Sequence, residues 1–258
     1  MKIFDFNDKI HKNLIRKREE KIQLKVLLII PAYNEEENIL NTVATIKEYS
    51  EEIDYIVIND GSKDNTLKIL KDNNIKHINL VENLGIGGAV QTGYKYAYEN
   101  GYDIAIQFDG DGQHDINYLP QICEPLINGQ ANMCIGSRYL DKTSSEFQST
   151  FMRRLGKNII SLIIRMCYRK KITDPTSGFR AIDRKIIEMF SKEYPVDYPE
   201  PESIVNVLNE RYKIEEVSVS MNERQGGKSS IRILNSMYYM FKVSLAILID
   251  SLNKKKVK

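Results

Sequence analysis

Continuously apolar runs alternate with segments of helical spacing from residue 25 to residue 139. The first run, KVLLIIPAY at 25–33, is typical of a strand that is covered on both faces. NEEENILNTVATIKEYS at 34–50 predicts the first helix, with its acids at the N-terminal end, where they favour the helix dipole. Further strand-like runs lie at 53–62, 75–82, 102–112 and 131–139. This alternation predicts an α/β fold with a doubly wound, mostly parallel sheet flanked by helices.

The second half of the chain is less regular. Residues 147–168 predict a basic amphipathic helix, and a loop, TDPTSGF, follows at 173–179. A helix from about Glu202 and a strand at 214–221 come next, followed by a polar loop at 222–230.

The charge distribution narrows the range of partners. A net charge of +2 is nearly neutral, so no nucleic acid partner is expected. Basic residues are nevertheless clustered, because residues 1–25 carry eight Lys or Arg against four acids, and 147–171 carry seven and no acid. Four of the last five residues are lysines. Such clusters form solvated faces or meet anionic lipid headgroups.

Cysteine use and hydropathy bear on the compartment. The three cysteines lack CxxC spacing, which predicts neither a disulfide framework nor a zinc site and fits a reducing cytoplasm. The first residues contain no apolar core of a secretory signal. No window reaches the ~20 apolar residues that span a bilayer.

Three aspartates follow the apolar run IAIQF within one short stretch, FDGDGQHD at 108–115. Carboxylates this close repel one another and lose hydration near a core, so a cation is expected among them. Asp109 and Asp111 are spaced so that one turn can direct both towards a divalent cation, and Gln113 can add a neutral oxygen. Such hard oxygen ligands suit Mg²⁺ or Mn²⁺. The alternative is a solvated Asp-Gly turn.

Polar residues also follow the other predicted strands. Asn34 and Glu35 follow the first strand, Asp60 ends the second and Arg138 ends the last. Ligands of such sheets bind beyond the carboxyl ends of the strands, so these residues and the aspartate pair predict one site. Asp60 has an alternative role as a turn or helix-capping residue. The glycine-rich stretch at 83–93 is either a phosphate-binding site at a helix N-terminus or a place of close helix–strand packing.

Seven motifs occur in order along the chain: IIPAYNEEENI, VINDGSKDNT, NLGIGGAVQTGYKYA, FDGDGQH, GSRY, DPTSGFRA and RQGGKSS. Together, over about residues 24–230, they resemble family 2 glycosyltransferases of the GT-A fold, and within that family the dolichyl- and polyprenyl-phosphate sugar synthases. The resemblance implies a Rossmann-like, mostly parallel sheet and an inverting, metal-dependent transfer of a sugar from a nucleoside-diphosphate sugar.

The resemblance also implies roles for residues of the motifs on the donor side. The nucleoside would be held by Pro31, Tyr33, Glu35 and Asp60. The Mg²⁺ or Mn²⁺ ion that bridges the donor diphosphate would be held by Asp109 and Asp111, with Gln113 nearby. A flexible segment that closes on the diphosphate would supply Arg224, Lys228 and Ser229.

On the acceptor side, the resemblance implies that a phosphate meets Arg138, Arg153 and Arg154. Asp174 is the candidate for positioning or deprotonating the acceptor, and Glu202 is the second candidate. Either carboxylate could instead be a helix-capping or first-turn acid. The helix that carries Arg153 and Arg154 could be basic only for solubility.

The segment at 232–252 has helical spacing and two unlike sides. Its apolar side on a helical wheel consists of Leu234, Met237, Tyr238, Met240, Phe241, Leu245, Ile247, Leu248 and Leu252. This amphipathic helix either packs on the domain or a partner, or lies in the bilayer interface with the lysine tail at anionic headgroups. The expected organisation is a basic extension at 1–24, a catalytic domain at 25–230 and this helix with its tail at 231–258.

The combined expectation is a glycosyltransferase that is cytoplasmic and peripheral on the inner face of the membrane, where it loads a sugar onto a polyprenyl (dolichyl or undecaprenyl) phosphate. Many proteins of the resembling group carry transmembrane helices after the catalytic domain, which leaves room here for a membrane-protein partner or a homo-oligomer. Two alternatives stay open. One is a transferase that acts on a hydroxyl of a growing cell-surface polysaccharide, and the other is a non-catalytic nucleotide-binding scaffold.

Overall fold

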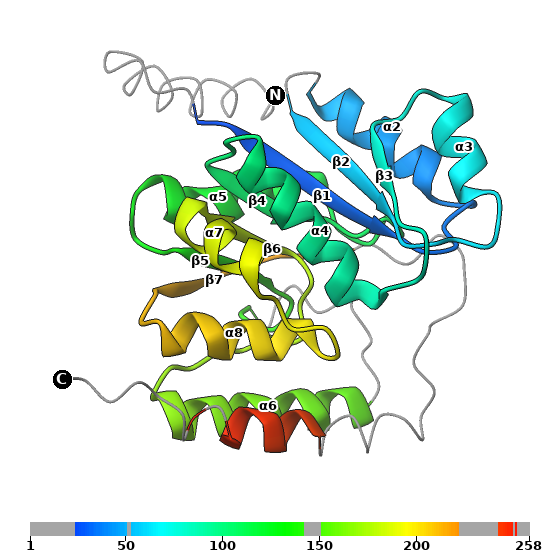
Figure 1. The fold of residues 1–258 in the computed structure, drawn as a ribbon. Helices are drawn as coiled ribbons and strands as arrows, with labels where there is room; N and C mark the ends of the chain where they lie inside the picture. Colours follow the sequence, from blue (N-terminus) through cyan, green and yellow to red (C-terminus); the bar gives the residue numbers. More distant parts are fainter. Residues whose placement is uncertain (1–23, 51–52, 142–150, 222–241, 250, 252–258) are drawn as a thin grey trace, which may run out of the picture.

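A seven-stranded sheet forms the centre of the molecule in this computed structural model, which describes residues 24–50, 53–141, 151–221, 242–249 and 251 (Figure 1). The strands are β1 (Val26–Ala32), β2 (Asp54–Asn59), β3 (His77–Asn79), β4 (Ile104–Gln107), β5 (Met133–Ser137), β6 (Arg180–Asp183) and β7 (Ile214–Ser218). Their order across the sheet is β3-β2-β1-β4-β6-β5-β7. Only β6 runs antiparallel to its neighbours in this sheet, so the predicted mostly parallel sheet is confirmed.

Helices cover both faces of the sheet. They are α2 (Ile39–Tyr49), α3 (Thr66–Asp72), α4 (Gly85–Glu99), α5 (Leu119–Ile127), α6 (Phe151–Tyr168), α7 (Arg184–Lys192) and α8 (Pro199–Asn209). Leu27 and Ile29 of β1 belong to the core cluster that α4 and α7 cover, whereas Leu28 and Ile30 belong to the cluster under α2 and α5. Because successive strand residues point to opposite faces, a strand covered on both sides is apolar throughout.

Strand β6 and helix α7 are not predicted by the sequence pattern. β6 is only four residues long and carries a charged residue at each end, Arg180 and Asp183, so it lacks a long apolar run. It lies between β4 and β5 and is antiparallel to both. Its N-terminal end therefore lies at the same edge as the carboxyl ends of its neighbours, which brings the loop at 173–179 to that edge.

Helix α2 begins later than the sequence predicts, at Ile39. Asn34 has a left-handed backbone conformation with φ of 56°. The N–H of Glu35 donates to the side chain of Thr66, the first residue of α3, and the N–H of Glu36 donates to Asp64 in the turn before it. The acids therefore precede α2, and none of them lies in its first turn.

The glycine-rich stretch at 83–93 is a place of close packing. A Cβ on Gly93 would lie 2.2 Å from Cγ2 of Ile29 on β1. A Cβ on Gly87 would lie 2.4 Å from the carbonyl oxygen of Pro195. Close approach of α4 to its neighbours thus accounts for both glycines, as the packing alternative predicts.

We expect Gly93→Ala to lower the free energy of unfolding by about 1–3 kcal/mol, because the added methyl group overpacks the contact between α4 and β1. Denaturant unfolding with an unchanged m-value measures this effect. Lys95→Ala on the exposed side of α4 is the control and should change the free energy by less than about 0.5 kcal/mol. Equal effects of the two substitutions would contradict close packing at Gly93.

Residues 242–249 form a helix at the lower edge of the molecule in Figure 1, where α6 also lies. Val243 and Ile247 belong to the same core cluster as Ile160 and Ile164 of α6. This part of the predicted C-terminal amphipathic helix therefore packs on the domain. Across the described ranges, no helix is both long and apolar enough to cross a bilayer.

Candidate functional site

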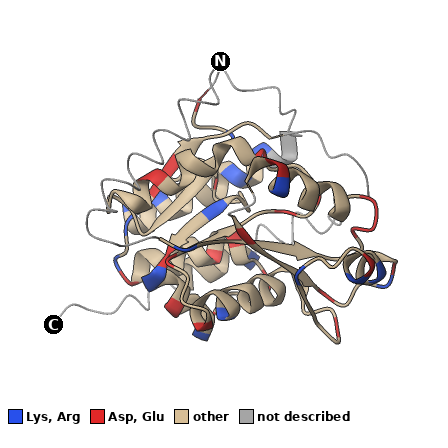
Figure 2. Cartoon of the chain, turned by 90° about the horizontal axis from the view of Figure 1, so that it is seen from above, with Lys and Arg blue, Asp and Glu red and all other residues tan. Residues whose placement is uncertain are grey.

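The carboxyl ends of β1, β2, β4 and β5 meet the loop before β6 at one edge of the sheet. The predicted residues that lie at or after these ends, or in this loop, are Pro31, Tyr33, Glu35, Asp60, Asp109, Asp111, Gln113, Arg138 and Asp174. Acidic and basic residues are otherwise interspersed over the helices and loops (Figure 2). The fold therefore gathers residues from separate motifs at one edge.

The turn after β4, which we call the aspartate turn, carries Asp109 and Asp111. The side chain of Asp109 is 34% exposed, and Oδ1 of Asp111 accepts the N–H of Gln113 at 3.1 Å. A hydrogen bond connects the turn to α2, because Oγ1 of Thr42 donates to the carbonyl oxygen of Gly110 at 3.0 Å. Two carboxylates and an amide oxygen on one partly exposed turn fit Mg²⁺ or Mn²⁺. No group of three or more His, Cys, Asp or Glu side chains in the described chain could hold a metal ion, so oxygens of a ligand would have to complete this set.

His114 anchors the same turn and is absent from the predicted site residues. Its ring stacks on Phe179 with the centroids 4.8 Å apart, and its Nδ1 accepts the backbone N–H of Asp109 at 2.9 Å. Burial lowers the pKa of His114 despite the nearby aspartates, so the neutral ring is available as an acceptor. The proton of the neutral ring then lies on Nε2, 3.3 Å from Oδ2 of Asp109. The position of His114 within the FDGDGQHD motif is the signal that could have identified it.

We expect His114→Phe to loosen the aspartate turn while keeping the ring packing. The phenyl ring can stack on Phe179, but the N–H of Asp109 loses its acceptor, which should lower the free energy of unfolding by about 1–3 kcal/mol. Denaturant unfolding and calorimetric titration with Mn²⁺ measure the loss of stability and of cation affinity. His114→Asn is the matched control, because its Oδ1 can replace Nδ1 as the acceptor. If the phenylalanine variant keeps both properties, ring packing rather than this hydrogen bond holds the turn.

Asp60 joins the end of β2 to the start of α4. Its Oδ1 accepts the N–H of Leu84 at 2.7 Å, and its carbonyl oxygen accepts from Nδ2 of Asn83 at 3.2 Å. Burial raises the pKa of Asp60, although the N–H groups of Leu84 and Gly85 act in the opposite direction. The side chain of Asp60 thus holds the start of α4, and its place at the strand end keeps it a candidate for the nucleoside.

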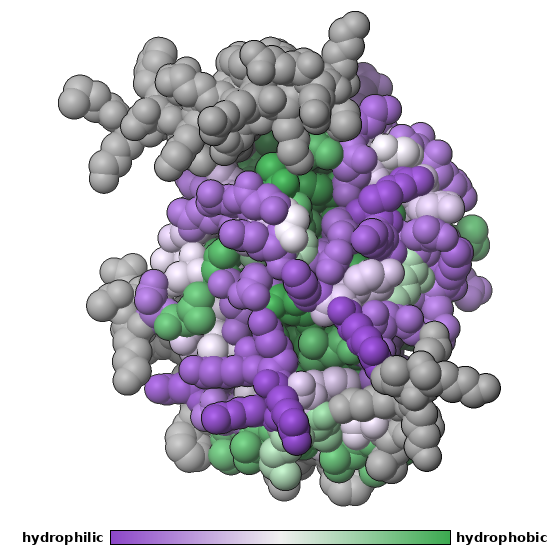
Figure 3. All heavy atoms as spheres, turned by 90° about the vertical axis from the view of Figure 1, so that its left-hand side faces the viewer, coloured by the Kyte–Doolittle hydropathy of each residue, from purple (hydrophilic) through white to green (hydrophobic). Residues whose placement is uncertain are grey.

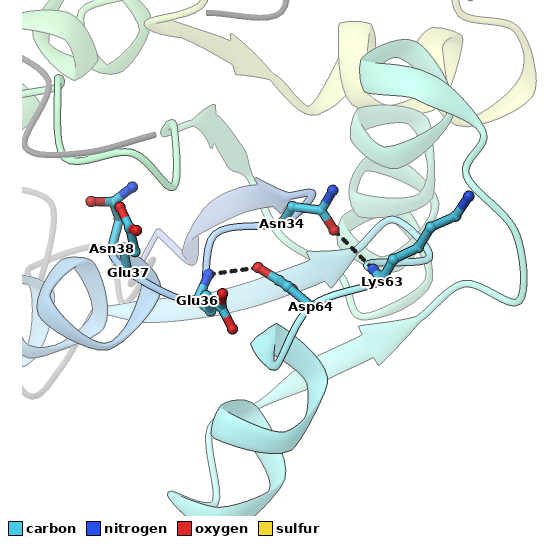
Figure 4. A pocket seen from close by; sticks show the side chains of 6 residues that line it. All are labelled: Asn34, Glu36, Glu37, Asn38, Lys63 and Asp64. Atoms are coloured by element: carbon cyan, nitrogen blue, oxygen red, sulfur yellow. Dashed lines mark hydrogen bonds between the residues drawn. The ribbon is translucent and has the colours of Figure 1, made fainter. Parts of the chain in front are cut away.

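A polar cavity of about 330 Å³ lies between the turns after β1 and β2 (Figure 4). The lining residues are Asn34, Glu36, Glu37, Asn38, Lys63 and Asp64. The N–H of Lys63 donates to Oδ1 of Asn34, and the N–H of Glu36 donates to Oδ2 of Asp64, so hydrogen bonds connect the two turns (Figure 4). The predicted residues Tyr33 and Glu35 belong to the same turn as four of these residues but do not line the cavity.

Arg138, directly after β5, forms a bidentate ion pair with Asp174. Its Nε donates to Oδ2 at 2.6 Å, and its Nη2 donates to Oδ1 at 2.9 Å. The side chain of Asp174 is 0% exposed and that of Arg138 is 15% exposed. Burial lowers the pKa of Arg138, but the hydrogen bonds and charge of Asp174 outweigh burial and leave that pKa above its usual range. A buried carboxylate in this pairing suits the positioning of Arg138 better than removal of a proton from an acceptor.

Lys157 and Glu216 lie beside the Arg138–Asp174 pair and are absent from the predicted site residues. We call these four residues the basic corner. Nζ of Lys157 on α6 donates to the carbonyl oxygen of Thr173 at 3.2 Å and lies 4.1 Å from the ring centroid of Tyr139. Glu216 of β7 accepts the N–H groups of Thr173 and Asp174 at 2.7 and 2.9 Å. Burial lowers the pKa of Lys157 and raises the pKa of Glu216. The sequence signals Lys157 only as one more basic residue of 147–171.

The aspartate turn and the basic corner are in contact at Gly178. A Cβ at this position would lie 3.2 Å from Oδ2 of Asp109 and 3.0 Å from Nε2 of Gln107. The loop that carries Asp174 therefore packs directly against the turn that carries Asp109. An acidic turn and a basic corner thus share one site.

The remaining predicted residues of the described chain lie on helices α6 and α8. Arg154 is exposed, one turn before Lys157 on α6, and the side chain of Arg153 lies outside the described part of the chain. Glu202 lies in the first turn of α8, where the helix dipole favours a carboxylate.

Arg224, Lys228 and Ser229 lie outside the described residues. The described chain before them ends at Met221, which forms an isolated antiparallel bridge with His114. The segment that contains these three residues therefore starts beside the aspartate turn.

Comparison with known sequences gives concordant results. A family model described as glycosyl transferase family 2 matches residues 27–190. The UDP-N-acetylglucosamine–dolichyl-phosphate N-acetylglucosaminyltransferase of Methanococcus voltae is 35% identical over 65% of this chain and 73% of its own length. The undecaprenyl-phosphate mannosyltransferase of Micrococcus luteus is 28% identical over 81% of this chain and 88% of its own. The polyprenol monophosphomannose synthase of Mycolicibacterium smegmatis is 27% identical, with 85% and 86% covered.

The fold also matches solved structures. Glucosyl-3-phosphoglycerate synthase from Mycobacterium tuberculosis, crystallised with Mn²⁺, UDP and phosphoglyceric acid, superposes with a TM-score of 0.67 at 18% identity. The match covers 94% of this chain and 82% of that one. The predicted GT-A architecture of the sheet and its helices is thereby confirmed.

Proposed function

The chain belongs to glycosyl transferase family 2, and we propose that it transfers a sugar from a nucleoside-diphosphate sugar to a polyprenyl phosphate. Relatives named for dolichyl, undecaprenyl and polyprenol phosphates support this acceptor class. The observation that carries the proposal is the contact between the aspartate turn and the loop that pairs Asp174 with Arg138. The acidic turn suits a cation-bound diphosphate, and the basic corner suits a second phosphate.

On the donor side, the diphosphate would lie over the aspartate turn. Asp109 and Asp111, with Gln113, would hold Mg²⁺ or Mn²⁺, which when bound offsets the charge that develops on the leaving diphosphate. The residues that would hold the nucleoside are Pro31, Tyr33, Glu35 and Asp60. The residues that would close on the diphosphate are Arg224, Lys228 and Ser229, and the bridge between Met221 and His114 supports this role by starting their segment at the turn.

On the acceptor side, Arg138 and Lys157 would hold the phosphate, with Arg153 and Arg154 on the same helix as Lys157. A phosphate is already an anion near neutral pH, so its oxygen can attack the anomeric carbon without a general base. The new bond joins this oxygen to the sugar with inversion, and the bond to the nucleoside diphosphate breaks. Asp174 would then orient Arg138, and Glu202 stays the second carboxylate candidate.

The test is a screen of nucleotide sugars with the purified protein and a polyprenyl phosphate, with and without a chelator. We expect one donor to give a glycosylated lipid phosphate and a free nucleoside diphosphate, and we expect the chelator to stop the reaction until Mn²⁺ or Mg²⁺ is restored. A folded protein that gives no product with any donor would overturn the proposal.

The same screen separates the two alternatives. Transfer to a saccharide hydroxyl, with none to the lipid phosphate, would support the polysaccharide transferase. Binding of UDP or GDP without any transfer would support the scaffold. The complete aspartate pair and the buried Arg138–Asp174 pair favour catalysis over a scaffold.

The acceptor chemistry also places the proposed reaction at a membrane. Because a polyprenyl phosphate is anchored by its lipid chain, the protein would be peripheral on the cytoplasmic face, where nucleotide sugars are available. A membrane-protein partner or a homo-oligomer stays a prediction.

A further inference from the structure

Glu200 lies in the first turn of α8 and is partly exposed. Burial raises the pKa of its carboxyl group, as it does for Asp60 and Glu216. Those two carboxylates accept backbone N–H groups of other residues. Within the described ranges, no other residue donates a hydrogen bond to the carboxylate of Glu200. It therefore loses hydration that the described residues do not replace, which suits it to a ligand that donates hydrogen bonds.

Charged side chains are otherwise abundant on the surface. Figure 3 shows one face of the molecule, on which strongly hydrophilic side chains project outwards on both sides of a band of apolar ones. Glu193, which directly follows α7, is exposed as well. The burial of Glu200 is therefore a property of its position and not of the acidic residues of this chain in general.

Arg180 of β6 holds the start of α8 beside the loop that precedes β6. The side chain of Arg180 is 0% exposed. Its Nη1 donates to the carbonyl oxygen of Glu200 at 2.9 Å and to Oγ of Ser203 at 2.6 Å. Its Nε and Nη2 donate to the carbonyl oxygen of Ser177 at 3.0 and 2.6 Å. One buried guanidinium thus fixes the backbone at residue 200 relative to this loop.

The same contacts place Glu200 near both halves of the site. Arg180 lies beside Gln107 in the sheet, and Nε2 of Gln107 donates to Oδ1 of Asp109 at 3.4 Å. The negative charge of Asp109 acts together with burial in raising the pKa of Glu200. The cations Arg180 and Arg138 act in the opposite direction. Glu200 is therefore close enough to interact with the aspartate turn and with the basic corner.

The donor sugar would lie between these two halves during the proposed reaction. Its anomeric carbon is bonded to the diphosphate, which would lie over the aspartate turn, and the phosphate that attacks this carbon would lie in the basic corner. The hydroxyl groups of the sugar would then be near Glu200. An ionised carboxylate offers two oxygens to such hydroxyls, and a hydrogen bond to a charged group is stronger than one between neutral groups.

We propose that Glu200 binds a hydroxyl group of the donor sugar and selects neutral sugars over uronic acids. The inference rests on the proposed function and deepens it by naming the class of sugar. A neutral sugar supplies the hydrogen-bond donors that the carboxylate of Glu200 lacks. A uronic acid would bring a further carboxylate close to Glu200 and Asp109, and like charges in one site repel.

Binding of nucleotide sugars tests this inference without an acceptor. The neutral probes are UDP-glucose, UDP-N-acetylglucosamine and GDP-mannose, and UDP and GDP are the references, all titrated calorimetrically in the presence of Mn²⁺. Glu200→Met keeps the size of the side chain and removes the acceptor oxygens. We expect it to weaken binding of the preferred nucleotide sugar by about tenfold and binding of the nucleoside diphosphate by less than about twofold. Glu200→Gln keeps one acceptor oxygen and should recover part of the loss.

UDP-glucuronic acid tests the exclusion of uronic acids. We expect Glu200→Gln to bind this probe about fivefold more tightly than the unchanged protein does, because one repelling charge is removed. Glu193→Gln is the matched control and should leave every affinity unchanged. The denaturant midpoint of Glu200→Gln should not fall, whereas it would fall if the carboxylate of Glu200 served only to neutralise the buried Arg180.

Two results would overturn the inference. The first is an equal effect of Glu200→Met on the nucleotide sugar and on its nucleoside diphosphate. The second is a lower denaturant midpoint of Glu200→Gln with unchanged affinities, which would assign Glu200 to the buried network around Arg180. Transfer to a polyprenyl phosphate separates this inference from the proposed function. Transfer by Glu200→Met with an unchanged kcat/KM for the donor would refute the inference alone. Sugar binding that Glu200→Met weakens, without any transfer by the unchanged protein, would refute the proposed function alone.

Discussion

The Asp111→Asn variant is expected to lose nearly all sugar transfer, with kcat/KM reduced by at least about 10²- to 10³-fold. The amide keeps the size of the side chain and an oxygen that can accept the N–H of Gln113, so the turn should stay folded. The substitution removes one of the two carboxylates that we propose as cation ligands. Release of the nucleoside diphosphate measures the rate, and the electron paramagnetic resonance signal of Mn²⁺ measures binding of the ion.

Asp115→Asn is the matched control for this substitution. Asp115 lies in the same loop, but its Oδ1 caps the short helix Ile116–Tyr118 by accepting the N–H of Asn117 at 2.9 Å. An asparagine oxygen can keep this bond, so the transfer rate and Mn²⁺ binding should be nearly unchanged. Chelator-resistant activity of Asp111→Asn at the level of the unchanged protein would show that the aspartate turn does not hold the ion.

The strand ends of the site could be predicted from the sequence because each ends an apolar run. Asp60 and Asp109 each follow a buried strand, and parallel strands bring their carboxyl ends to one edge of a sheet. Arg138 follows the same rule after β5. These positions follow from the hydrophobic pattern of the strands and from the direction of the chain, and both can be read from the sequence.

The other half of the site depends on contacts that periodicity does not display. β6 is short, and its antiparallel course alone brings Asp174 to the edge where Arg138 lies. Lys157 resembles its basic neighbours until α6 packs on the domain and turns one of its faces towards the loop at 173–179. His114 needs a buried ring partner, Phe179, that is distant in the sequence. Tertiary packing decides each of these placements.

Arg138→Ala is expected to have the second large effect, on both stability and transfer. It leaves the fully buried carboxylate of Asp174 without its cation, which should lower the free energy of unfolding by about 3–5 kcal/mol. It also removes a proposed contact with the acceptor phosphate. Denaturant unfolding measures the first effect, and the KM for the acceptor, assayed well below the unfolding transition, measures the second. Arg138→Lys keeps the charge but cannot form the bidentate pair, so its loss of stability should be smaller than that of Arg138→Ala.

Removing both partners separates the structural role of Arg138 from its role in binding. The double substitution Arg138→Met with Asp174→Leu removes both charges of the buried pair, and replacing a buried pair by apolar groups of similar volume is often neutral for stability. We therefore expect the double variant to recover most of the free energy of unfolding that Arg138→Ala loses. Transfer should stay low, because no cation is restored to meet the acceptor phosphate. If transfer recovers together with stability, the pair only holds the loop at 173–179 in place, and the acceptor phosphate is bound elsewhere.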